Sequence, residues 1–466
     1  MKSVRVVFLL VAAGLVFGAL AGAAVTWDGG YYLFRALDQG TPYVPHERWV
    51  NLPIQWIVLA VSQLTRDPQV LIAVFGLVYV GIVLGSMALG WWIVRDEARG
   101  LFIWMLLGTG LALLPGFFTY MTEALIVVIV FWPVLLGTLV RSTLPKAMVM
   151  VAITMISPFI HPFSIPMTLC AAGMALLVGA RHRALRRGKW LWMFWFIVVA
   201  IVSVVRFMNV TDSYETERLT LDALRSSYEL SIAGLPLVAL SGAVLAGSAV
   251  LAGPWLARSR GSLPGRIVQA IELGSAIVVA SSLTLWAGNS RWWGAEIAFR
   301  TWTFFATLPF IGLALLDGFR SDSEQTHTEA QWRHRRRTSQ VAAAVFLLVM
   351  CVQSLSWAAL NHDLQATLAQ SPTACVPLSV LSRALGTGGT ALGHWSVTPY
   401  SLLIQGDSPS RVVLSDELCE KADFEAGLPI ASWDLRAWEG GAYDLSLLRD
   451  GLTDAKPAWH VEGGQR

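Results

Sequence analysis

The chain is poor in charge and carries none of the common nucleotide-binding or hydrolase motifs. Asp, Glu, Lys and Arg make up 14% of its 466 residues, whereas soluble domains contain about 25%. No GxxxxGK[ST], HExxH or GxSxG segment occurs, which argues against a nucleotide-driven pump or a familiar hydrolase. No pair among the four cysteines has the spacing of a metal site, and no tandem repeat is evident.

Hydrophobic residues make up most of the chain instead. They account for 55% of it, and the mean hydropathy is +0.57. Apolar runs of membrane-spanning length recur along most of the sequence, which predicts a mainly α-helical, polytopic membrane protein. We expect about eleven spans, near residues 4–25, 71–94, 101–117, 121–140, 146–158, 163–180, 190–207, 231–253, 267–286, 298–317 and 339–359.

Two of these regions allow an alternative. The spans 146–158 and 163–180 are separated by Ser157-Pro158-Phe159-Ile160-His161-Pro162, and two prolines so close together also fit a re-entrant turn. The first span ends in Ala21-Gly22-Ala23 and also resembles a signal peptide. Under either interpretation of the first span, the residues that follow it lie outside the cytoplasm.

The distribution of basic residues predicts the orientation. One alternating set of loops holds 19 Lys or Arg, whereas the opposite set, which includes residues 26–70, holds seven. Cytoplasmic loops are enriched in Lys and Arg. We therefore expect a multi-pass protein of the plasma (inner) membrane with a cytoplasmic N-terminus and an external C-terminus. This alternation requires residues 146–180 to cross an even number of times.

The C-terminal tail differs in composition from the rest. Residues 1–360 form the expected transmembrane domain, with a first external loop at 26–70. Residues 361–466 have no spanning run and carry 13 Asp or Glu against seven Lys or Arg. Turn clusters separate short apolar stretches there, which predicts a small external α/β domain. Two cysteines in an exported domain commonly pair, so we favour a disulfide between Cys375 and Cys419 over two buried thiols.

The polar residues that this topology places outside suit sugar transfer from a lipid-linked phosphate. A carboxylate can take the proton of an acceptor hydroxyl, and cationic side chains can stabilise a leaving phosphate. The catalytic candidates are Asp28, directly after the first span, and Glu123, at the start of the fourth. The candidates for substrate binding are His46, Arg48, His161, Arg206, Arg291 and Arg300.

The segment around Asp28 carries a resemblance to a family. Trp27-Asp28-Gly29-Gly30-Tyr31-Tyr32-Leu33 is similar to the first external loop of GT-C-fold glycosyltransferases, and residues 43–49 resemble the interfacial helices of that loop. The resemblance implies a polytopic enzyme that uses a polyprenyl-phosphate sugar, with Asp28 as its catalytic acid–base residue. Its partners would be membrane lipid and that donor; the C-terminal domain could also bind a protein, and no nucleic acid is expected.

The sequence departs from the family pattern, and other functions stay open. Gly29 rather than a second acid follows Asp28, so Glu123 would supply that acid. One carboxylate holds a divalent cation poorly, which leaves the cofactor undecided and no metal ligand assigned. Asp28 also fits a span end followed by a glycine turn, Glu123 a helix cap, and His161 a bond to the broken backbone. The alternative functions are a lipid or solute transporter and a non-catalytic envelope assembly protein.

Overall fold

The computed structural model shows a mainly helical protein with few, short strands. It describes residues 2–26, 28–44, 48–113, 122–182, 185–209, 307, 310–312, 314–315, 318, 329–384, 396–421, 424, 427–431 and 434–454.

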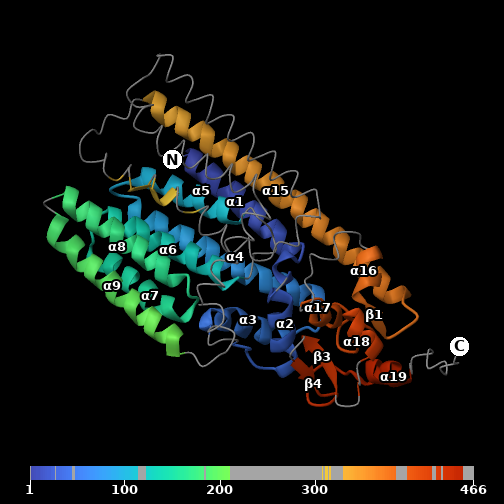
Figure 1. The fold of residues 1–466 in the computed structure, drawn as a ribbon. Helices are drawn as coiled ribbons and strands as arrows, with labels where there is room; N and C mark the ends of the chain where they lie inside the picture. Colours follow the sequence, from blue (N-terminus) through green and yellow to red (C-terminus); the bar gives the residue numbers. More distant parts are fainter. Residues whose placement is uncertain are drawn as a thin grey trace, which may run out of the picture.

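Residues 2–209 contribute a bundle of helices (Figure 1). α4 packs against α1 and α6, and α8 packs against α6 and α9. Large apolar side chains such as Phe75, Phe131 and Trp132 are fully buried between them. The bundle consists of α1 (Lys2–Leu20), α4 (Pro68–Val94), α5 (Phe102–Leu113), α6 (Glu123–Leu139), α7 (Leu144–Ile156), α8 (Ser164–Arg181) and α9 (Arg186–Asn209).

Three of these helices, α4, α8 and α9, are long and apolar enough to cross a membrane. They coincide with the spans expected at 71–94, 163–180 and 190–207. The apolar stretches in α1, α6 and α7 have 10–17 residues, fewer than the roughly 20 that a full crossing needs. The spans expected at 231–253 and 267–286, and most of 298–317, lie outside the described residues. The structure supports a membrane protein, and the count of eleven spans stays a prediction.

The loop between α1 and α4 contains helices, most of which the sequence did not predict. They are η1 (Ala23–Val25), α2 (Asp28–Gln39), η3 (Trp49–Asn51) and α3 (Leu52–Ser62). Of residues 43–49, which resemble interfacial helices in the sequence, Tyr43, Val44 and Arg48 lie outside any helix and Trp49 begins one. Gly29 and Gly30 are buried inside α2, so the alternative of a glycine turn after Asp28 is wrong. A Cβ atom on Gly30 would lie only 2.6 Å from the carbonyl oxygen of Val25, and glycine is therefore needed for this close packing rather than for a turn.

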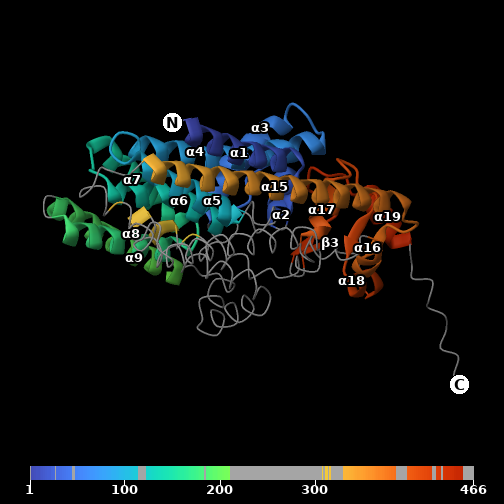
Figure 2. The same ribbon diagram turned by 90° about the horizontal axis from the view of Figure 1, so that it is seen from above.

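α15 (Glu329–Gln370) runs beside α1, as Figures 1 and 2 both show. Gly14 lets the two helices approach, because a Cβ atom there would lie 3.3 Å from Cβ of Met350. α15 continues beyond the span expected at 339–359 and passes residue 360 without a break. Leu360, Leu364 and Leu368 are buried at helical spacing, and their burial explains why the helix persists.

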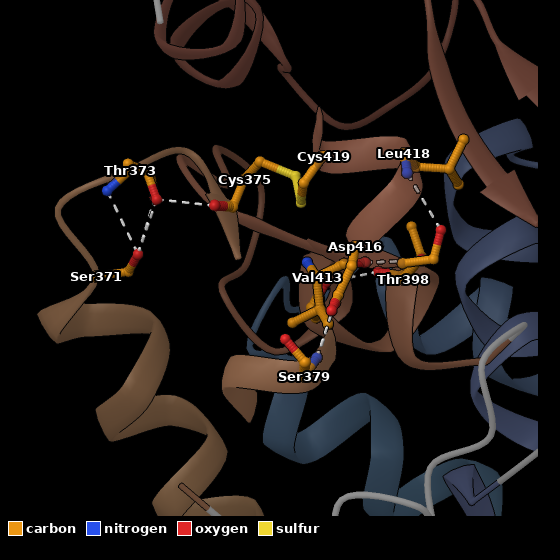
Figure 3. Close-up of a disulfide and its surroundings, with 11 residues drawn as sticks. Ser371, Thr373, Cys375, Ser379, Thr398, Val413, Asp416, Leu418 and Cys419 are labelled. Atoms are coloured by element: carbon orange, nitrogen blue, oxygen red, sulfur yellow. Dashed lines mark hydrogen bonds between the residues drawn. A yellow bond between two sulfur atoms is a disulfide. The ribbon is translucent and has the colours of Figure 1, made fainter. Parts of the chain in front are cut away.

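The C-terminal part, residues 371–454, combines short helices with two small sheets at one end of the molecule (Figures 1 and 2). Strand β1 (Cys375–Pro377) is parallel to β2 (Val412–Leu414), and β3 (Leu428–Ala431) is antiparallel to β4 (Asp434–Arg436). A disulfide joins Cys375 to Cys419 (Figure 3), the pairing that the sequence favoured. The helices are α16 (Leu378–Ala384), α17 (Val397–Leu403), α18 (Asp416–Lys421) and α19 (Ser446–Asp454).

Candidate functional site

Contacts between helix termini show which termini lie at each end of the bundle. At one end, Glu97 follows α4 and accepts hydrogen bonds from Lys146 Nζ and from the backbone N–H of Arg141, both at 2.8 Å. Lys189, in the first turn of α9, donates to the carbonyl oxygen of Val140 at 2.7 Å. The C-terminal ends of α4 and α6 and the start of α9 therefore meet at this end. The starts of α4 and α6, and the end of α9, lie at the other.

Glu123 is buried at that other end, where the first loop holds it. Thr122 caps α6 by accepting a hydrogen bond from the N–H of Leu125, so Glu123 occupies the first turn, where the helix dipole favours a negative charge. Glu123 is 1% exposed. Its Oε2 accepts from Arg48 Nη1 at 3.2 Å, and its Oε1 accepts from Asn51 Nδ2 at 3.1 Å. Both carboxylate oxygens are therefore engaged, which suits an anchor better than a freely reacting acid.

Tyr32 connects the two predicted acids. Its side chain is buried and hydrogen-bonded to Glu123. Burial raises the pKa of the Tyr32 phenol well above its usual value, and the negative charges of Glu123 and then Asp28 raise it further. Asp28 lies one helical turn before Tyr32 in α2 and Tyr32 is hydrogen-bonded to Glu123, so the two acids flank the same tyrosine. The structure thus brings together residues that lie 95 positions apart in the sequence.

Asp28 differs from Glu123 in its exposure. It is the first residue of α2 and is partly exposed. Positions 28, 31, 32 and 35 are spaced three or four residues apart, which places them on one face of the helix. The cluster therefore offers one partly exposed carboxylate on a helix face that also carries two tyrosines and an arginine.

An aromatic group beside this face was missed by the sequence analysis. The hydroxyls of Tyr31 and Tyr43 lie 3.3 Å apart, and their rings meet edge to face at 5.4 Å. The guanidinium of Arg35 lies over the ring of Tyr43, 5.1 Å from its centroid. Gln55 fixes Tyr43 by bonding both its backbone N–H, at 2.6 Å, and its carbonyl oxygen, at 3.0 Å. The spacing of Tyr31, Tyr32 and Arg35 could have indicated this group, but only if residues 28–39 had been predicted to form a helix.

His161 and Arg206 stabilise the break between α7 and α8. The helix ends at Ile156, passes through η6 (Ser157–Phe159), and α8 begins at Ser164. His161 Nδ1 accepts from the N–H of Phe163 at 3.1 Å. Arg206 donates to the carbonyl oxygen of Pro158 at 2.6 Å and lies over the ring of Phe159, 4.6 Å from its centroid. These contacts give both residues a structural role, and substrate binding by either stays a prediction.

The remaining candidates can be placed only in part. Arg48 lies in the cluster through its ion pair with Glu123, whereas His46, Arg291 and Arg300 lie outside the described residues. Across the part of the chain that the structure describes, no group of three or more His, Cys, Asp or Glu side chains could hold a metal ion. The described cluster therefore consists of carboxylates, arginines, an asparagine and tyrosines.

Comparison of the chain with protein-family models, curated proteins and solved structures gives no match.

Proposed function

We propose that this protein is a membrane glycosyltransferase that transfers a sugar from a polyprenyl phosphate to an acceptor at the external face of the plasma membrane. In this proposal the first loop and the C-terminal part are external. The observation that carries it is the position of Asp28, a partly exposed carboxylate next to the buried Tyr32–Glu123–Arg48 network. The three membrane-length helices support a membrane protein, and a polyprenyl-phosphate donor would lie in the same bilayer.

The proposed reaction uses the face of α2. The acceptor oxygen forms a bond to the anomeric carbon, the bond from that carbon to the phosphate oxygen breaks, and the acceptor proton passes to Asp28. Arg35, two turns along the same face, supplies positive charge to the leaving phosphate. Glu123 acts as a positioning residue, because Arg48 and Asn51 occupy its two oxygens.

The test is Asp28→Asn, measured as sugar transfer from a polyprenyl-phosphate donor in membranes. The amide keeps the shape of the side chain but cannot accept the proton, so we expect a loss of about 10²–10⁴-fold in kcat with an unchanged amount of folded protein. The matched control is Glu439→Gln, which neutralises an exposed carboxylate of the C-terminal part. Wild-type transfer by Asp28→Asn would refute the catalytic role of Asp28, whereas an absence of transfer by the unmodified protein would refute the proposal and favour the non-catalytic assembly protein.

A further inference from the structure

α2 has a second face, which contacts the C-terminal part at each of three successive turns. Gly30, Phe34 and Asp38 are spaced four residues apart and so lie along one side of the helix. A Cβ atom on Gly30 would lie 3.5 Å from Cδ2 of Tyr400, and the rings of Phe34 and Tyr443 are 4.9 Å apart. Asp38 pairs with Arg436. Three successive turns of the helix that begins with Asp28 are therefore held from one side.

The contact at Asp38 is a closed, bidentate ion pair between residues 398 positions apart. Arg436 donates from Nε to Oδ2 at 2.7 Å and from Nη2 to Oδ1 at 2.6 Å, and both residues are 7% exposed. The backbone N–H of Ala442 also donates to the carbonyl oxygen of Asp38 at 2.8 Å. Gly441 covers the pair so closely that a Cβ atom there would overlap both Arg436 Nη2 and Asp38 Oδ1. A fork–fork pair fixes orientation as well as distance.

The C-terminal part is itself tied to α15. The hydroxyl of Tyr400 donates to Oδ1 of Asn361 at 2.8 Å, and the ring of Tyr400 lies 5.5 Å from that of Trp357. Trp357 is fully buried, and a Cβ atom on Gly22 would lie 3.5 Å from its Nε1. α2 is thus braced, through the C-terminal part, against a long helix that packs along α1 rather than against a detached domain.

We propose that Asp38 and Arg436 are positioning residues that, through α2, fix the orientation of Asp28. Holding one side of a helix at three successive turns prevents the helix from rolling about its axis. A roll would turn Asp28 and Tyr32 away from Glu123, because these residues lie on the adjacent face of the same helix. The effect on kcat rests on the proposed function, whereas the effect on the mobility of α2 does not.

The test compares Asp38→Asn, Arg436→Gln, their double variant and Gly441→Ala with the control Arg449→Gln, which breaks an exposed ion pair in the same part of the chain. Gly441→Ala separates the pair without removing a charge, so it remains informative if a neutralised variant folds poorly. We expect each test variant to lower kcat by about 10–100-fold at unchanged donor KM. The double variant should be no worse than the poorer single variant, because both act through one contact.

A second readout does not depend on catalysis. Amide hydrogen exchange of residues 29–37 should become at least tenfold faster in each test variant and stay unchanged in α9. If exchange and kcat both match those of Arg449→Gln, the inference is wrong even where Asp28→Asn is inactive. If Asp28→Asn is fully active, the role proposed for Asp28 fails. If the unmodified protein transfers no sugar while exchange in α2 still accelerates in the test variants, the proposed function fails and the brace on α2 stands.

Discussion

Removing the charge of Glu123 tests whether the buried network holds the first loop to α6. Glu123→Gln keeps the size of the side chain and an oxygen acceptor for Asn51, so it isolates the loss of charge opposite Arg48. The two side chains are 2% and 4% exposed and approach to 3.2 Å. Unit charges at that separation attract by about 5 kcal/mol at an effective dielectric constant of about 20. Measured losses on breaking one side of a buried pair are about 3–5 kcal/mol, so we expect destabilisation of that size.

The assay is thermal unfolding in nanodiscs, followed by intrinsic fluorescence. A loss of this size should lower Tm by roughly 3–5 °C in a chain of 466 residues. The matched control is Glu97→Gln at the opposite end of the bundle, because the Glu97 side chain is 34% exposed in its ion pair with Lys146 and solvent screens such a pair. Replacing both partners with Arg48→Met and Glu123→Leu should recover most of the loss. A Tm for Glu123→Gln equal to that of the control would refute the anchoring role.

Two further predictions concern the C-terminal part and the buried tyrosines. Cys419→Ser should destabilise the C-terminal part by about 4 kcal/mol, from the chain entropy of a loop that spans 44 residues; the check is unfolding with and without reductant, and an identical stability of the reduced and oxidised protein would contradict it. Burial raises the pKa of Tyr32, Tyr400 and Tyr443, so the folded state keeps protons that the unfolded state loses above about pH 10. Stability should not depend on these groups below pH 10 and should fall above it by up to about 1.4 kcal/mol per pH unit for each tyrosine. Tyr443→Phe should remove one such contribution from an alkaline pH series, and an unchanged slope would count against it.

The apolar runs predicted the helices well where span length and composition were decisive. The expected spans at 71–94, 163–180 and 190–207 differ from α4, α8 and α9 by four residues or fewer at either end, because about 20 apolar residues are what a bilayer requires. The same criterion missed α2 and α3, since neither is long enough to register as a span. α2 begins with Asp28-Gly29-Gly30, a pattern that also fits a turn, and only the packing of Gly30 on Val25 distinguishes the two.

The candidate site was predicted in part. Asp28, Glu123 and Arg48 were chosen because the predicted topology puts them on one side of the membrane and the segment around Asp28 resembles a glycosyltransferase loop. The structure places them in one cluster, and their roles stay predictions. Tyr32, which is buried, and Tyr43, which is partly buried, were given no role, since such tyrosines look like ordinary interfacial aromatics in a sequence. The pairing of Asp38 with Arg436 could not be derived from sequence, because it depends on how the C-terminal part docks on α2. His161 and Arg206 were chosen as substrate-binding candidates because they are polar residues near span ends. Their hydrogen bonds to the backbone of Phe163 and Pro158 show that the break between α7 and α8 also requires polar side chains.

Because α15 is continuous, it fixes the rotation of the C-terminal part about the helix axis relative to the bundle. Its 42 residues extend about 63 Å at 1.5 Å per residue, roughly twice the hydrocarbon thickness of a bilayer. Trp357 faces Gly22 in the bundle, and Asn361, one turn later, holds Tyr400. One residue inserted between them would turn Asn361 by about 100° and advance it by about 1.5 Å, and would carry Arg436 away from Asp38. The number of residues between Trp357 and Asn361 is therefore fixed by packing at both ends, and an insertion or deletion there would break the contacts that hold α2.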